Sequence, residues 1–138
     1  MRRKATAANR TQFGNFVEEQ TCRWLTQQGV HILERNFRCR SGEIDIIGRH
    51  RGFLVFIEVR FRRSNRYGGA AASVDARKQL KLAKAAQFFL LRHRALQNAA
   101  CRFDVIAVSG KNVQPGSDQL EFDWHRAAFS LDDISHAF

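Results

Sequence analysis

The chain has 138 residues, 44% of them hydrophobic, and carries a formal net charge of +10 at pH 7. This length and apolar content are enough for one buried core, which excludes a disordered chain and favours a single folded domain. The excess of Lys and Arg favours a polyanion as partner, most simply nucleic acid. The alternative is that the positive charge only aids solubility.

Other protein classes are excluded by what the sequence lacks. Cys22, Cys39 and Cys101 are odd in number and widely spaced, so we expect neither a zinc site nor a disulfide framework, and a reducing, cytoplasmic location. The apolar runs fall short of the ~20 residues that a membrane span needs, so no membrane contact is expected. Residues 1–10 are basic without an apolar stretch, and we interpret them as a flexible tail before a domain over residues 11–138.

The first predicted element is a helix over residues 11–28, ended by Gly29. Glu18 lies at the edge of its apolar face, where a carboxylate can reach a site beside the sheet. The alternative is a capping box of Asn15 and Glu18, if the helix starts late. The sequence leaves both interpretations open.

A strand over residues 30–37 leads into a hairpin around which the domain is organised. Its predicted strands are residues 42–47 and 53–61, joined by a turn at residues 48–52. Alternation predicts one apolar face, made of Ile44, Ile46, Val55, Ile57 and Val59. The opposite face carries Glu43, Asp45, Glu58 and Arg60.

The register of this hairpin brings two carboxylates together. If the loop that closes the hairpin has an even number of residues, odd positions of the first strand lie opposite even positions of the second, so Asp45 lies opposite or diagonal to Glu58, about 5–8 Å away between backbones. A slip of one residue would press Asp45 against apolar side chains, which is costly. Two carboxylates beside the cation of Arg60 can hold Mg²⁺ or Mn²⁺ and leave room for a phosphate. A simple cross-strand ion pair is the alternative.

Cationic side chains follow the hairpin. Arg62, Arg63 and Arg66 lead away from the proposed site into a loop. A helix is predicted over residues 74–94, with a basic stripe that can contact phosphates along a nucleic-acid backbone. The stripe consists of Arg77, Lys81 and Lys84, with Lys78 beside them. For the loop and for the helix, the alternative is a solvated charged surface.

Two further strands are predicted, over residues 101–108 and 120–125. In the first, Phe103, Val105 and Ala107 alternate with Asp104 and its neighbours, and we interpret Asp104 as structural. The five histidines show no spacing typical of metal ligands. The sequence therefore predicts one α/β domain with a mixed central sheet flanked by two helices.

Four sequence blocks occur in an order that resembles the bacterial YraN-like family: GEIDII, FIEVRFRR, YGGAAASVDARKQLKL and CRFDVIAV. The resemblance runs from Gly14 to the C-terminal Ala-Phe. That family in turn resembles the restriction-endonuclease-like, PD-(D/E)XK superfamily and, within it, the archaeal Holliday-junction resolvases. The resemblance implies a nuclease-like α/β fold with Glu on a helix, Asp on the first hairpin strand and Glu-x-Lys on the second.

Carried over residue by residue, the resemblance implies Glu18, Asp45 and Glu58 as metal-binding carboxylates, with Arg60 at the position of the lysine. Gln79 and Glu43 are accessory candidates beside the site. The implied function is Mg²⁺-dependent or Mn²⁺-dependent hydrolysis of nucleic acid, with DNA, including branched or damaged DNA, as the favoured partner. The alternatives are a non-catalytic nucleic-acid-binding module and a protein-interaction domain whose charge is incidental, and a homodimer is compatible with each.

Overall fold

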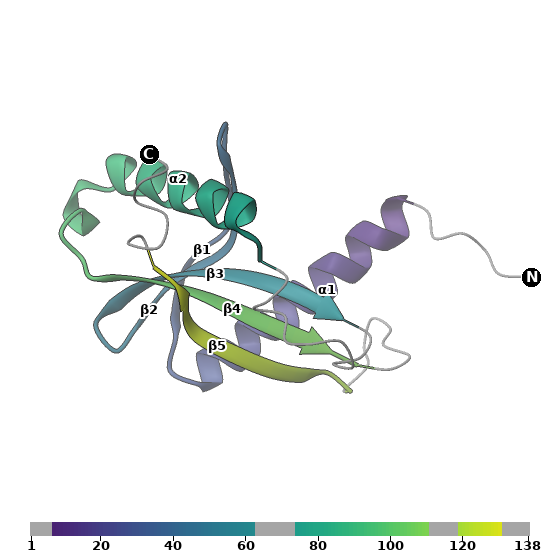
Figure 1. Ribbon diagram of the computed structural model, residues 1–138. Helices are drawn as coiled ribbons and strands as arrows, with labels where there is room; N and C mark the ends of the chain where they lie inside the picture. The colour runs from purple at the N-terminus through teal and green to yellow at the C-terminus, as the bar shows by residue number, and fades with distance from the viewer. Residues whose placement is uncertain (1–6, 63–73, 111–118, 131–138) are drawn as a thin grey trace, which may run out of the picture.

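The computed structural model describes residues 7–62, 74–110 and 119–130, and for residues 7–11 it describes the backbone alone. Within these ranges the chain forms a five-stranded sheet in the order β1-β2-β3-β4-β5 with two helices (Figure 1). Only β3 and β4 pair in parallel, so the expected mixed α/β sheet flanked by helices is confirmed. The elements are α1 (Ala7–Gln27), β1 (His31–Cys39), β2 (Gly42–His50), β3 (Phe53–Arg62), α2 (Ala76–Arg92), the short 3₁₀ helix η2 (Arg94–Leu96), β4 (Cys101–Ser109) and β5 (Glu121–Phe129).

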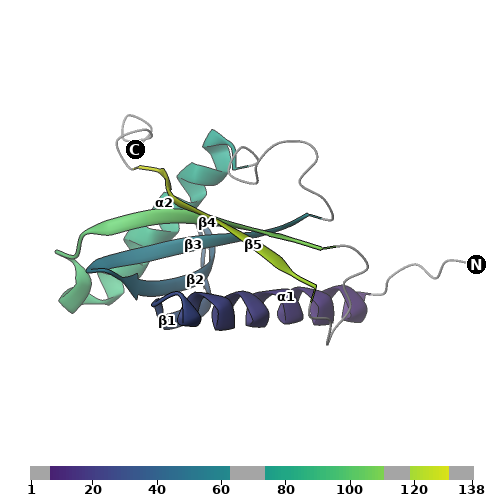
Figure 2. The same ribbon diagram turned by 90° about the horizontal axis from the view of Figure 1, so that it is seen from below.

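The two helices cover opposite faces of the sheet and create two apolar layers (Figures 1 and 2). Alternation along β3 sends Val55 and Ile57 toward α1, whereas Leu54 and Phe56 pack in the layer under α2. The same period of two in β4, which the sequence predicts, is confirmed, and it places Phe103, Val105 and Ala107 under α2. Because both faces are covered, the inner strands are apolar on both sides.

The central hairpin turns at Arg51 and Gly52 alone, and the predicted turn over residues 48–52 is wrong because β2 continues to His50. The φ angles of Arg51 and Gly52, 50° and 83°, both lie in the left-handed region. Such two-residue turns match the twist of the strands and favour Gly at the second position. The turn sets a register in which Ile46 pairs with Ile57 and Ile47 with Phe56, so the predicted odd-to-even pairing is confirmed.

The predicted apolar face of the hairpin is wrong at Ile44. Ile46 packs toward α1, but Ile44 is buried in the layer under α2, so strict alternation breaks at Asp45. Pairing of β2 with β3 stops at Ile46 and Ile57, while β3 continues to Arg62 beside β4. The start of β2, which remains paired with β1, thus turns away from β3 toward the side of α2 (Figure 1).

Close backbone contacts accompany this departure. A Cβ on Gly42 would lie 3.4 Å from the Cβ of Lys81, so the start of β2 rests against α2. Further along, a Cβ on Gly48 would lie only 2.8 Å from a Val30 methyl group, where β1 approaches β2. Glycine at both positions lets neighbouring backbone come close.

The helix bounds also differ from the prediction. α1 begins at Ala7 instead of residue 11, so residues 7–10 belong to the helix and not to a tail. Asn15 and Glu18 therefore lie in the helix interior, and the capping-box interpretation of Glu18 is wrong. α2 begins at Ala76 because the side chain of Asp75 accepts a hydrogen bond from the backbone N–H of Lys78, 2.9 Å away.

β5 extends to Phe129, beyond the predicted end at residue 125. Its outer part is attached through Asp104, a buried carboxylate on β4 that accepts hydrogen bonds from the Trp124 ring N–H and the Ala127 backbone N–H. The guanidinium of Arg102 completes the set, 2.9 Å from Asp104. A structural role for Asp104 fits these bonds, since nearly all its acceptor capacity is used. Neither helix of the described residues has the length and apolar character of a membrane span.

Candidate functional site

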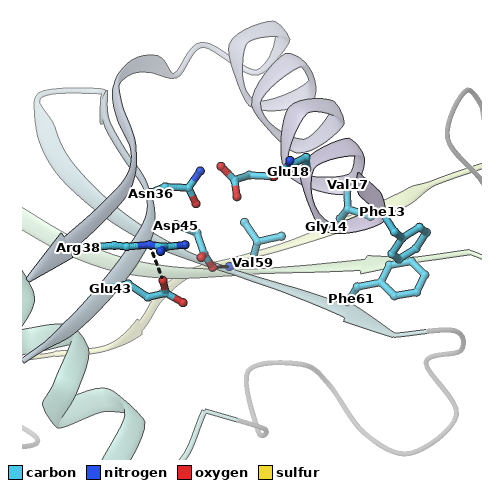
Figure 3. Close-up of a pocket in the computed structure, with 11 residues that line it drawn as sticks. Phe13, Gly14, Val17, Glu18, Asn36, Arg38, Glu43, Asp45, Val59 and Phe61 are labelled. Carbon is cyan, nitrogen blue, oxygen red and sulfur yellow. Dashed lines mark hydrogen bonds and ion pairs between the residues drawn. The ribbon is translucent and has the colours of Figure 1, made fainter. Parts of the chain in front are cut away.

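A pocket of about 330 Å³ opens where β2 leaves β3, between the sheet and the N-terminal half of α1 (Figure 3). Phe13 and Phe61 form part of its apolar wall, with ring centroids 5.0 Å apart. The polar residues lining it come from α1, β1 and β2: Asn15, Glu18, Asn36, Arg38, Glu43 and Asp45. Polar groups converging on a partly apolar pocket are typical of a binding site.

Glu18 reaches this pocket from α1, as expected for the helix-borne carboxylate. Figure 3 shows Glu18 and Asn36 pointing toward each other above Asp45. The Nε of Arg35 lies 3.3 Å from Oε1 of Glu18. Burial raises the pKa of Glu18, opposed by the charge and hydrogen bond of Arg35, while the nearby charge of Asp45 raises it further. Glu18 and Asp45 therefore share one electrostatic environment.

Asp45 is held at the split between the two strands. Its Oδ2 accepts a hydrogen bond from the backbone N–H of Val59, at 2.8 Å. Burial raises the pKa of Asp45, the Val59 bond opposes this, and the charge of Glu43 adds to it. The carboxyl of Glu58 also acts on the pKa of Asp45, and the charge of Asp45 acts on Glu58 in return, so the two carboxyl groups lie close together. The predicted proximity of Asp45 and Glu58 is thus present in the structure.

Glu58 is the more deeply buried of the two carboxylates, with 6% of its side chain exposed. Its Oε1 lies 3.5 Å from Nε of Arg60 and 3.5 Å from Nζ of Lys78. Its Oε2 is buried and has no hydrogen-bond partner. Burial and then the charge of Asp45 raise the pKa of Glu58 to about 7, against the opposing effects of Lys78 and Arg60. An unpartnered buried carboxylate oxygen is costly and in proteins often marks a missing ligand.

The carboxylate oxygens of the site meet part of what a hard divalent ion needs. Across residues 7–62, 74–110 and 119–130, no group of three or more His, Cys, Asp or Glu side chains is spaced to hold a metal. Asp45 and the unpartnered oxygen of Glu58 supply two adjacent carboxylates, which is the protein contribution that Mg²⁺ commonly takes while keeping several waters. Glu18 would then act across the pocket, through water.

The cations fall into two groups. Arg77, Lys81 and Lys84 are exposed on one face of α2, and Arg62 is exposed at the end of β3. Lys78 is different, because its ammonium group lies against Glu58. The predicted Arg63 and Arg66 lie outside the described residues.

The accessory candidates have local partners. The side-chain amide of Gln79 donates to the backbone carbonyl of Val74, at 2.9 Å, which supports the start of α2. Glu43 lines the pocket and forms an ion pair with Arg38, with 3.4 Å between Oε2 and Nε (Figure 3).

The sequence reasoning missed Arg35 and Asn36, two site residues on β1. Asn36 has a φ of 53°, in the left-handed region that Asn tolerates better than most residues, and its side chain, which points toward Glu18, helps to lower the pKa of that carboxyl. No local pattern marks either residue, because strand β1 reads as an ordinary polar edge strand.

The fold and site define a small mixed α/β protein with a carboxylate pocket at the split of its central hairpin. The chain belongs to uncharacterised protein family UPF0102, whose model matches residues 17–108. This confirms the family expected from the four sequence blocks. The chain is 47% identical to a UPF0102 protein of Alcanivorax borkumensis over 84% of its length and 90% of that protein. It is 45% identical to one from Alkalilimnicola ehrlichii, over 94% of this chain and 95% of the relative.

Proposed function

We propose that this protein is a metal-dependent nuclease with a restriction-endonuclease-like core, hydrolysing phosphodiester bonds in DNA and acting in the cytoplasm. One observation carries the proposal: the buried, unpartnered Oε2 of Glu58 lies beside a second carboxylate, Asp45, at the point where the two hairpin strands separate. Glu18 faces Asp45 from α1, which agrees with the arrangement that the superfamily resemblance implies.

The residues of the site would have separate roles in the reaction. Asp45 and Glu58 would hold Mg²⁺ or Mn²⁺, and Glu18 would position a water molecule across the pocket. A divalent ion bound there would polarise the scissile phosphate and neutralise part of the charge that develops on it. Arg60 would serve as a fixed positive charge beside Glu58, because a guanidinium is a poor general base. The exposed cations of α2 would hold the nucleic-acid backbone.

The test is incubation of the purified protein with labelled single-stranded, duplex, flap and four-way-junction DNA, and with matching RNA, in Mg²⁺, Mn²⁺ or EDTA. We expect cleavage of at least one DNA structure that requires the metal and is lost in Asp45→Ala. Asp123→Ala is the matched control, since this aspartate on β5 is exposed and does not line the pocket. Metal-independent cleavage, or cleavage that survives Asp45→Ala, would contradict the proposal.

A second candidate function is a non-catalytic nucleic-acid-binding module with the same fold. It is favoured by Arg60 at the lysine position and by the absence, within the described residues, of a three-ligand metal cluster. It predicts binding to the same panel without cleavage by wild type in any metal.

A further inference from the structure

The first turn of α2 directs one lysine at the carboxylate site. The side chain of Asp75 caps the helix by accepting a hydrogen bond from the backbone N–H of Lys78. This bond fixes the position of Lys78 in the first turn. Its ammonium group lies 3.5 Å from Oε1 of Glu58, and 30% of its side chain is exposed. The neighbouring cations Arg77 and Lys81 are exposed instead. Lys78 thus belongs to the site, while the rest of the stripe belongs to the surface.

Two cations converge on a single oxygen of Glu58. Arg60 approaches Oε1 along the strand through its Nε, at 3.5 Å, and that Nε has no hydrogen-bond partner. Lys78 approaches the same oxygen from the helix. A divalent ion held by Asp45 and Glu58 would balance both carboxylates, so one of the two cations would be available to a negatively charged substrate. Of the two, Lys78 has the compact group with three rotatable donors, which can bind Glu58 and a phosphate oxygen together.

We propose that Lys78 takes the place of the lysine of the Glu-x-Lys motif, with its ammonium group contacting the scissile phosphate, while Arg60 keeps Glu58 in position. The inference rests on the proposed nuclease function and adds a catalytic residue to it. It also explains how an Arg can occupy the motif position without loss of the chemistry, because the lysine comes from a different element of the fold.

The proposed step is ordinary hydrolysis. The water oxygen forms a bond to phosphorus, the P–O bond to the leaving alcohol breaks, and its electron pair stays on the leaving oxygen. Water provides the hydroxyl that remains on the phosphate and a proton that balances the one taken up by the leaving oxygen. The ammonium group of Lys78 donates hydrogen bonds to a non-bridging phosphate oxygen as charge builds there. Preorganised donors of this kind act strongly in a partly dry site.

The experiment compares Lys78→Gln with Arg49→Gln, a control that removes an exposed cation from β2, away from the site and from the cations of α2. We expect Lys78→Gln to slow DNA cleavage about 10²- to 10³-fold, as for other single donors to a developing anion. Its DNA affinity should stay within about threefold of wild type, as should the cleavage rate of Arg49→Gln. Lys78→Arg should restore part of the rate because it returns the positive charge.

A titration with Mn²⁺ provides a readout independent of activity. Lys78→Gln should bind Mn²⁺ at least as tightly as wild type, because a cation beside the Glu58 carboxylate has been removed. Weaker Mn²⁺ binding in this variant would show that Lys78 only supports the site structurally, and would overturn the proposal.

Arg60→Lys keeps the proposal testable even if Lys78→Gln folds poorly. Since Lys78 already fills the role, restoring a lysine at position 60 should not raise cleavage above the wild-type rate. A large gain in Arg60→Lys, or wild-type rates in Lys78→Gln, would overturn the assignment of Lys78 while leaving the nuclease function intact. Absence of cleavage by wild type on the whole panel would instead contradict the nuclease function, and with it this inference.

Discussion

The carboxylate of Asp45 accepts a hydrogen bond from the backbone N–H of Val59, with 2.8 Å between Oδ2 and N. It does so just beyond the last paired residues of β2 and β3, Ile46 and Ile57. A side chain therefore replaces the strand-to-strand bond that β2 no longer provides. The same bond holds Asp45 between the pocket and Glu58. The separation of β2 from β3 and the candidate site therefore have one structural cause.

Stability should depend on the apolar layer more than on this acid. Ile57→Ala removes a fully buried side chain and should lower the free energy of unfolding by about 2–5 kcal/mol. Asp45→Asn keeps an oxygen that can accept from Val59 and removes repulsion with Glu58, so without metal its effect should be within about 1 kcal/mol. Denaturant melts of both variants test this. A larger loss in Asp45→Asn would favour a structural ion-pair role over a metal site.

The stability of the protein should fall between about pH 5 and pH 8 in metal-free buffer. The pKa of Glu58 rises from 4.5 to about 7 on folding, and the pKa of Asp45 is also raised. For an acid with a raised folded pKa, stability is fully present below the unfolded pKa and is lost as pH rises through the folded pKa. The loss from Glu58 should be on the order of 2–3 kcal/mol.

Comparison of wild type with Glu58→Gln isolates this contribution. The variant should lose less stability between pH 5 and pH 8, and Glu121→Gln, which changes an exposed carboxylate on β5, should behave like wild type. Equal pH dependence in wild type and Glu58→Gln would show that Glu58 does not titrate in this range.

The exposed cations of α2 should contribute to nucleic-acid affinity. Reversing charge at Arg77, Lys81 and Lys84 should weaken binding and flatten the slope of log affinity against log salt by about one unit for each lost phosphate contact. Fluorescence anisotropy at several salt concentrations measures both quantities.

The matched control reverses three exposed arginines on other elements, Arg23, Arg49 and Arg126. It changes the net charge equally, so the two variants separate a local contact surface from a general charge effect. Equal losses of affinity in both variants would indicate attraction by net charge alone. An unchanged affinity in the α2 variant would show that this face of the helix is only a solvated surface.

Asp104 should be the most important buried acid for stability. It accepts from Arg102, from the Trp124 ring and from the backbone of Ala127, all at 2.8–2.9 Å. Asp104→Asn places an amide N–H₂ against these donors and leaves Arg102 without its counter-charge, so unfolding should become easier by about 3–5 kcal/mol. Asp123→Asn, at an exposed position on β5, should change stability by less than about 0.5 kcal/mol. A thermal melt of each variant checks the contrast.

Much of the fold is readable from local patterns. The strands β3 and β4 show a clear period of two, and the left-handed turn at Arg51 and Gly52 sets the register of the hairpin. Asp45 and Glu58 were predicted to be neighbours from that register. Helix starts were less predictable, because Ala7 and Ala8 extend α1 without any capping signal.

The sequence by itself determined which residues of the hairpin meet, since alternation and turn length act over a few neighbouring residues. Only the tertiary structure decided that Ile44 packs under α2, that Arg35 and Asn36 contact Glu18, and that Lys78 reaches Glu58. Each of these depends on how a helix or an edge strand packs against the sheet. Such contacts join residues far apart in the chain, and the fit of complete elements decides them rather than any local period.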